Sequence, residues 1–148
     1  MKRRSLLGLL AAVPLAQSLT ARAATQVQVY KNPSCGCCTG WVDHLKAAGF
    51  VVAVTETDDT GPLRKRLGVP DRLAGCHTGV VEGYALEGHV PAAEVKRLLA
   101  LKPNAVGLAV PGMPVGSPGM EYGDRKEPYQ VILIGRNARD TVFARYPL

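Results

Sequence analysis

The chain shows two spacings of hydrophobic positions, one typical of strands and one typical of helices. Val27 and Val29 alternate with polar residues, whereas Trp41, Val42 and Leu45 recur at helical spacing. The two spacings, followed along the chain, predict a series of short elements before residue 104. The strands are 26–30, 51–55, 78–81 and 84–87, and the helices are 38–48, a short one through 63 and 67, and one from 91 that ends before 103. The predicted order is therefore β-α-β-α-β-β-α.

The rest of the chain divides into an irregular segment and a hairpin. Residues 104–128 are rich in Gly and Pro and show little periodicity, and irregular segments of this length are more often functional than idle. Residues 131–134 and 141–146 have strand character on either side of 135–137, which predicts a terminal hairpin. A single α/β domain with an added C-terminal loop and hairpin accounts for this pattern.

The N-terminal segment has the composition of a secretory signal peptide. A basic head at residues 2–4 precedes an apolar stretch at 5–19, and residues 21–23 place alanines where a signal peptidase reads the chain. The apolar stretch is short for a membrane span. We expect cleavage near Ala23, a mature domain of residues 24–148 and a periplasmic location. The arginines of the head also resemble the twin-arginine export pattern, so that route and the Sec route both stay open.

The charge balance excludes a nucleic-acid binder. The full chain has 18 Lys and Arg residues against 12 Asp and Glu residues. The predicted signal peptide contains four of the basic residues and no acidic one, which leaves 14 against 12 in the mature chain. Such a balance lacks the basic footprint of nucleic-acid binding. The cluster Arg64-Lys65-Arg66 is interpreted as the solvated face of a short helix, and no membrane-spanning segment is predicted after cleavage.

All four cysteines of the chain fall in two places, Cys35-Gly36-Cys37-Cys38 and Cys76. Cys35 and Cys38 have CxxC spacing, which is typical of dithiol redox chemistry or of half a metal site. A cysteine at the start of a helix is favoured as a thiolate, which serves either chemistry. The third thiol, Cys37, is redundant for a simple disulfide and useful for a thiophilic metal. Structural disulfides remain an alternative in an oxidising compartment.

The order of elements, with CxxC at the junction of the first strand and first helix, is that of a thioredoxin-like domain. In such domains the position before the third strand usually carries a cis-proline beside the CxxC. Here Cys76-His77 occupies that position. We interpret this replacement of the cis-proline by Cys76-His77 as a site built to admit metal, because it adds a fourth sulfur and an imidazole. A disulfide between Cys76 and one of the clustered cysteines is the alternative.

The available donors suit copper. Soft thiolates, imidazole and thioether together favour Cu(I) among the biological metals. Cys37 and Cys38 are adjacent on one helical turn and point in different directions, which predicts more than one ion with bridging thiolates. His89 has either a ligand role or a capping role. Met113 and Met120, the methionines of the irregular segment, are either ligands or core residues.

These motifs closely resemble those of the CopG-like family of periplasmic copper-resistance proteins. Nothing in this sequence departs from the family's motif. The resemblance implies a thioredoxin-like fold that binds copper through the cysteine cluster. It also implies a role in copper tolerance in which copper changes between Cu(I) and Cu(II). The matching segments are 31–38, 75–78, 87–91 and 106–114.

Three functional hypotheses follow. The first is a periplasmic copper-binding protein that uses the thiolates of Cys35, Cys37, Cys38 and Cys76, with His77, His89 and the two loop methionines completing or gating the site. It leaves copper oxidoreductase activity open and has other periplasmic copper-handling proteins as partners. The second is a metal-independent thiol–disulfide oxidoreductase that uses Cys35 and Cys38. The third is a copper store or carrier without turnover.

Overall fold

The computed structural model describes residues 24–147 of the chain. The predicted signal peptide, residues 1–23, lies outside the described residues. Within residues 24–147, no helix combines the length and apolar character needed to cross a membrane.

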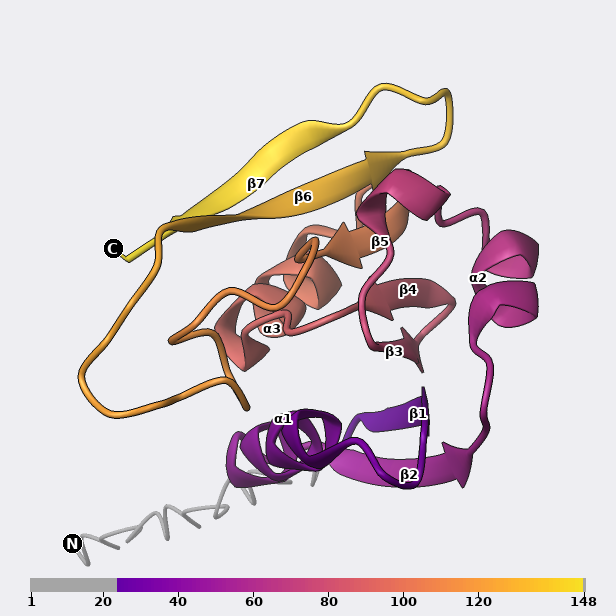
Figure 1. Cartoon of the computed structure of the whole chain (residues 1–148). Coiled ribbons are helices and arrows are strands. Elements are labelled where there is room, and N and C mark those ends of the chain that lie inside the picture. The colour runs from indigo at the N-terminus through magenta and orange to yellow at the C-terminus, as the bar shows by residue number, and fades with distance from the viewer. Residues whose placement is uncertain (1–23, 148) are drawn as a thin grey trace, which may run out of the picture.

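The described residues form a mixed α/β domain whose elements follow the predicted order (Figure 1). The order β-α-β-α-β-β-α is confirmed, and the terminal hairpin is present. The strands are β1 (Gln26–Lys31), β2 (Val51–Glu56), β3 (His77–Val81), β4 (Tyr84–Glu87), β5 (Ala105–Ala109), β6 (Tyr129–Gly135) and β7 (Thr141–Tyr146). The helices are α1 (Gly36–Ala47), α2 (Gly61–Leu67) and α3 (Ala92–Leu101), with a 3-10 turn, η1 (Asp71–Leu73), before β3.

All the strands join in one sheet with the order β2-β1-β3-β4-β5-β6-β7. The pairs β1–β2 and β4–β5 are parallel, and the other neighbours are antiparallel. The β3–β4 hairpin turns at Glu82 and Gly83, which both have positive φ, as a two-residue turn of primed type requires. Because β1 and β3 are neighbours, the end of β1 and the start of β3 lie side by side, Lys31 opposite His77.

Strand β5 corrects the prediction that residues 104–128 are irregular throughout. Its residues are almost all buried, so the sequence there lacks the alternation that marks a strand with one solvated face. Gly107 interrupts the apolar run, yet the strand requires it. A Cβ on Gly107 would overlap the Ala85 carbonyl oxygen of the neighbouring strand β4. The segment after β5 is irregular as predicted, and it runs from the sheet across to α1 (Figure 1).

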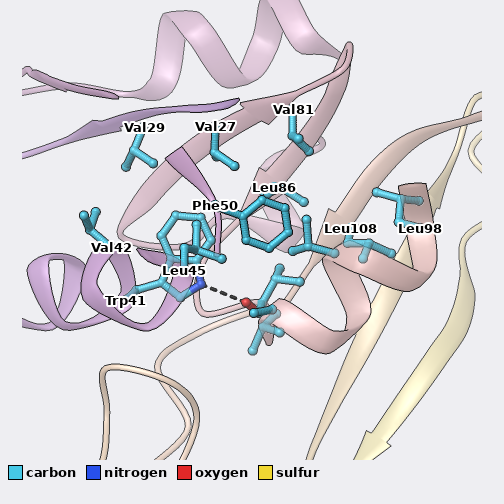
Figure 2. Packing of buried hydrophobic residues seen from close by; sticks show 14 of the residues in the cluster. Val27, Val29, Trp41, Val42, Leu45, Phe50, Val81, Leu86, Leu98 and Leu108 are labelled. Atoms are coloured by element: carbon cyan, nitrogen blue, oxygen red, sulfur yellow. Dashed lines mark hydrogen bonds between the residues drawn. The ribbon is translucent and has the colours of Figure 1, made fainter. Parts of the chain in front are cut away.

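The two faces of the sheet carry separate apolar clusters. On one face α1 and α3 pack against strands through Trp41, Leu45 and Leu98 together with Leu86 of β4 (Figure 2). On the other face Ala85, the neighbour of Leu86, joins a smaller cluster that α2 and η1 cover; its buried members are Val69, Leu73, Ala85, Ala109 and Ile134. The alternation of neighbouring β4 residues between faces is the period of two that a strand imposes.

Trp41 links this core to the cysteine region. Its indole is fully buried, and Nε1 donates a hydrogen bond to the Val90 carbonyl oxygen at 2.8 Å (Figure 2). Its ring also lies against His77, with 4.3 Å between ring centroids. Gly79 of β3 leaves room for the indole, because a Cβ there would lie 3.2 Å from the ring. The apolar stripe predicted on α1 therefore packs in the core, and its Trp41 also contacts His77 next to Cys76.

Candidate metal centre

The start of α1 brings three cysteines together. Cys35 is the N-cap residue of α1, and its Sγ accepts a hydrogen bond from the Cys38 backbone N–H at 3.3 Å. Cys37 and Cys38 lie in the first turn, Cys38 fully buried and Cys37 partly exposed. Cys76 approaches from the loop before β3, so that the sulfurs of all four cysteines lie within 4.8 Å of one another. The predicted cluster of four sulfurs is therefore present.

Two of the four cysteines are paired in this structure. Cys35 and Cys38 form a disulfide, whereas Cys37 and Cys76 are free thiols. Sγ of Cys37 lies 3.4 Å from Sγ of Cys35 and 3.9 Å from Sγ of Cys76. The predicted alternative in which Cys76 joins a disulfide is not what the structure contains. A site of four thiolates requires the Cys35–Cys38 bond to be reduced.

Two histidines add nitrogen donors around Cys76. Sγ of Cys76 lies 3.3 Å from Nδ1 of His77 and 3.2 Å from Nε2 of His89. Nδ1 of His89 lies 2.8 Å from the Pro118 carbonyl oxygen, which only accepts, so Nδ1 of the neutral ring carries the hydrogen. Nε2 of His89 then presents its lone pair to Cys76. Cys76, His77 and His89 thus form a second group of donors that shares Cys76 with the cysteine cluster.

Burial keeps this group uncharged in the metal-free protein. It lowers the pKa of His77 to about 3, and the neighbouring His89 adds to the shift. Burial likewise lowers the pKa of His89. Burial, followed by the neighbouring Cys37, raises the pKa of the Cys76 thiol to about 12. Both imidazoles are therefore free to donate lone pairs, whereas Cys76 must lose its proton when a metal binds.

A buried carboxylate holds the loop that carries Cys76. Oε1 of Glu87 accepts a hydrogen bond from the Gly75 backbone N–H at 2.7 Å, and Oε2 accepts one from the Thr78 hydroxyl at 2.7 Å. Arg64 of α2 lies 3.8 Å from the same carboxylate. Burial raises the pKa of Glu87, while the bond from Gly75 works against that rise.

Arg64 therefore departs from the prediction that its cluster is a solvated face, which holds only for the exposed Lys65 and Arg66. Glu87 is a further residue of the site, for which no role was predicted. Its signal was a carboxylate at the end of a strand that is otherwise apolar, directly before the histidine motif.

The two loop methionines differ in their surroundings. Met120 is 8% exposed, and Met113 is 53% exposed. Gly119, next to Met120, packs on the first turns of α1, where a Cβ would lie 2.5 Å from the Cys37 carbonyl oxygen. This packing brings the backbone before Met120 to the cysteine cluster, and nothing comparable places Met113 there. The ligand role of either methionine stays a prediction.

Two solved structures resemble this fold over nearly their whole length. Both are described as copper resistance protein CopG, one as form 2 and the other as form 1. They share 47% and 46% sequence identity with this chain, each with a TM-score of 0.80. Each match covers 84% of this chain and 99% of the matched chain. The chain belongs to the CopG family of copper resistance proteins.

The matching sequence family is less informative about function. Residues 73–120 match a sequence family described as "Protein of unknown function, DUF411". That segment includes Cys76, His77, His89, Met113 and Met120, so all the predicted donors outside the CxCC motif lie within it. A search of curated proteins found no match. Membership of the CopG family and a cysteine cluster able to hold metal together support a copper-related function.

Proposed function

We propose that this protein binds copper through its cysteine cluster as part of copper resistance, and that it interconverts Cu(I) and Cu(II). The observation that carries the proposal is the convergence of four sulfurs and two imidazoles around Cys76. Thiolates are soft ligands that select Cu(I), and imidazole also suits Cu(II). A site that holds both donor types next to each other is suited to copper in either oxidation state.

The overlap of the two donor groups supports binding of more than one ion. Cys76 belongs both to the cysteine cluster and to the group with His77 and His89. A thiolate in this position is able to bridge two copper ions, one on each side. Sγ of Cys76 lies 3.3 Å from Nδ1 of His77 and 3.2 Å from Nε2 of His89, so imidazole donors flank that sulfur. We propose Met120 and Met113 as additional ligands or gating residues.

The setting of the protein is part of the same proposal. We propose that residues 1–23 are a signal peptide, that residues 24–148 are the mature periplasmic domain, and that other periplasmic copper-handling proteins exchange copper with it. We also propose that the first part of the domain is thioredoxin-like. The parallel β1–β2 pair, the antiparallel β3 and β4, and a CxxC at the start of α1 support that relationship.

The copper stoichiometry tests the proposal. Fully reduced protein titrated anaerobically with Cu(I) is expected to bind more than one equivalent, and Cys37→Ser is expected to lower that number, because Cys37 lies between Cys35 and Cys76. His44→Gln is a matched control, since His44 lies on α1 outside both donor groups. Unchanged copper uptake by Cys37→Ser would contradict a site with several ions, and no uptake by the parent protein would contradict copper binding altogether.

The Cys35–Cys38 disulfide favours one alternative, a metal-independent thiol–disulfide oxidoreductase. Its prediction is reductase activity on a model disulfide substrate without metal, unchanged in Cys76→Ser. The first residue of β3 argues against this alternative. It is His77, where thioredoxin-like reductases carry the cis-proline that shapes their substrate groove, and the only cis peptide in residues 24–147 precedes Pro147.

A further inference from the structure

The disulfide divides the four cysteines into two pairs with different surroundings. The Cys35–Cys38 pair is oxidised, whereas Cys37 and Cys76 remain thiols beside the two imidazoles. The oxidised pair therefore leaves a second set of donors intact. That set contains the sulfurs of Cys37 and Cys76, 3.9 Å apart, and Nε2 of His89, 3.2 Å from Sγ of Cys76. A protein that only stored copper on four thiolates would have no use for this division.

We propose that the Cys35–Cys38 dithiol supplies the electrons that reduce Cu(II), and that Cys37, Cys76 and His89 retain the Cu(I) produced. The inference rests on the proposed copper function and specifies which groups exchange electrons. Two Cu(II) ions each accept one electron and become two Cu(I) ions. The two thiols lose two protons to solvent and form the Cys35–Cys38 bond, so charge, atoms and electrons balance.

The geometry distinguishes the electron-donating pair from the retaining pair. Cys35 caps α1 and accepts the Cys38 N–H, a position where the free N–H groups of the helix favour thiolate. Sγ of Cys37 lies 3.4 Å from that of Cys35, which places a metal held by Cys37 beside the donor pair. Cys76 contacts both imidazoles, and the loop that carries it is held by Glu87. Cys76 is thus placed as a ligand and not as a member of the redox couple.

The exposure of the two paired sulfurs shows how the dithiol is restored. Cys38 is fully buried, whereas Cys35 is partly exposed. An external dithiol attacks the sulfur of Cys35, forms a mixed disulfide there and releases Cys38 as the thiol. The second thiol of the external reductant then breaks the mixed disulfide, so that the reductant leaves as a disulfide and Cys35 is regenerated. One dithiol is consumed for each pair of Cu(II) ions.

A thiol inventory after one turnover tests the proposal. Fully reduced protein receives two equivalents of Cu(II) anaerobically, a chromogenic Cu(I) chelator is added to one half, and thiols are counted and mapped by mass spectrometry in both halves. We expect two Cu(I) per protein, a fall from four free thiols to two, and a disulfide between Cys35 and Cys38. A disulfide between Cys37 and Cys76, or random pairing, would overturn the assignment.

Substitutions test separately the electron-donating pair, Cys35 and Cys38, and the retaining thiol Cys76. Cys35→Ser and Cys38→Ser are each expected to slow Cu(I) formation at least tenfold, and Cys35→Ser keeps a side chain that is able to cap α1, because serine is a preferred N-cap residue. Cys76→Ser is expected still to form the Cys35–Cys38 disulfide when Cu(II) is added, but to lose the Cu(I) on gel filtration without the chelator. Equal rates in the parent protein and Cys35→Ser would overturn the proposal.

The same experiment distinguishes a failure of the electron-donor assignment from a failure of the proposed copper binding. If the reduced protein binds copper and keeps all four thiols, the electron-donor assignment is wrong while copper binding stands. If the reduced protein binds no copper, both are wrong. Disulfide formation without bound copper in the chelator-free half would likewise overturn the retaining role of Cys37, Cys76 and His89.

Discussion

Glu87 and Thr78 are joined by a fully buried hydrogen bond of 2.7 Å directly behind the Cys76-His77 pair. The second carboxylate oxygen of Glu87 binds the Gly75 N–H, so one side chain holds the residues on both sides of that pair. Arg64 lies 3.8 Å from this carboxylate and supplies a positive charge beside it. The position of Cys76 in the cluster therefore depends on a residue that binds no metal itself.

Removal of this carboxylate is expected to destabilise the protein and to disturb its copper site. Glu87→Ala leaves the Gly75 N–H, the buried Thr78 hydroxyl and Arg64 without their carboxylate partner, and we expect a loss of about 3 kcal/mol in the free energy of unfolding. Thr78→Val is the control, because it removes one donor and keeps the bond to Gly75, at a cost of about 1 kcal/mol. Urea denaturation of the reduced, metal-free proteins measures both. Equal losses in the two variants would show that Glu87 does not act as a clamp.

His89 is expected to matter for copper through a single ring nitrogen. The Pro118 carbonyl oxygen holds the hydrogen on Nδ1, which orients Nε2 toward Cys76. We expect His89→Gln to weaken copper binding at least tenfold, about the lower end of the effect of disturbing a metal ligand's surroundings. Competition with a Cu(I) chelator at fixed pH measures the affinity.

The control for that variant is His44, which is partly buried, whereas His89 is fully buried, and whose ring holds the start of a helix. Nε2 of His44 accepts a hydrogen bond from the Ala92 N–H at the start of α3. His44→Gln is expected to lower the free energy of unfolding by about 1 kcal/mol, as the loss of a helix cap does. Its copper affinity should equal that of the parent. A comparable loss of affinity in both histidine variants would argue that His89 acts only through the fold.

The buried His77 predicts a loss of stability in acid. Burial, together with the neighbouring His89, lowers the pKa of His77 from 6.5 to about 3. The unfolded chain therefore takes up the proton first, so stability is full above pH 6.5 and declines as the pH falls toward 3. At about 1.4 kcal/mol per pKa unit, the loss between pH 7 and pH 5 is about 2 kcal/mol.

His77→Phe isolates this contribution in the metal-free protein, because the phenyl ring keeps a flat surface for Trp41 and does not titrate. Glu87 changes the stability with pH in the opposite direction, since its raised pKa lets the folded protein take up a proton first. Its contribution is the same in parent and variant and cancels in the comparison. We expect the variant to lose about 2 kcal/mol less than the parent between pH 7 and pH 5. Parallel pH profiles would show that His77 is not held neutral by the fold.

The sequence was sufficient for local structure and insufficient for long-range pairing. The alternation around Val27 and the helical stripe through Trp41 identified β1 and α1, because one solvated face leaves a clear period. Strand β5 was missed because it is buried on both faces and contains Gly107. A strand of that kind has no period to detect.

In the candidate site, too, local motifs were predictable from the sequence and long-range contacts were not. The CxCC motif and Cys76-His77 were recognisable because their residue types are rare and their spacing is short. The contact between Arg64 and Glu87 joins a helix to a strand on a distant part of the chain, and neither residue carries a pattern that points to the other. The pairing of Cys35 with Cys38 was also open, because several pairings of four cysteines are compatible with one sequence.

Gly119 provides a test of the contact between the long loop and the metal centre. Its φ is +86°, and a Cβ would lie 2.5 Å from the Cys37 carbonyl oxygen and 2.7 Å from the Trp41 backbone nitrogen. Gly119→Ala therefore forces the loop away from α1 and withdraws the neighbouring Pro118 carbonyl oxygen from His89.

Gly123→Ala is the matched control, since Gly123 also has a positive φ, +60°, but a Cβ there would meet no atom within 4 Å. The control is expected to cost about 1 kcal/mol, the strain of a left-handed alanine. Gly119→Ala should cost more than this and also weaken copper binding at least tenfold, because Nε2 of His89 loses its fixed orientation. Copper affinity that is unchanged in Gly119→Ala would mean that the loop covers the site without organising it.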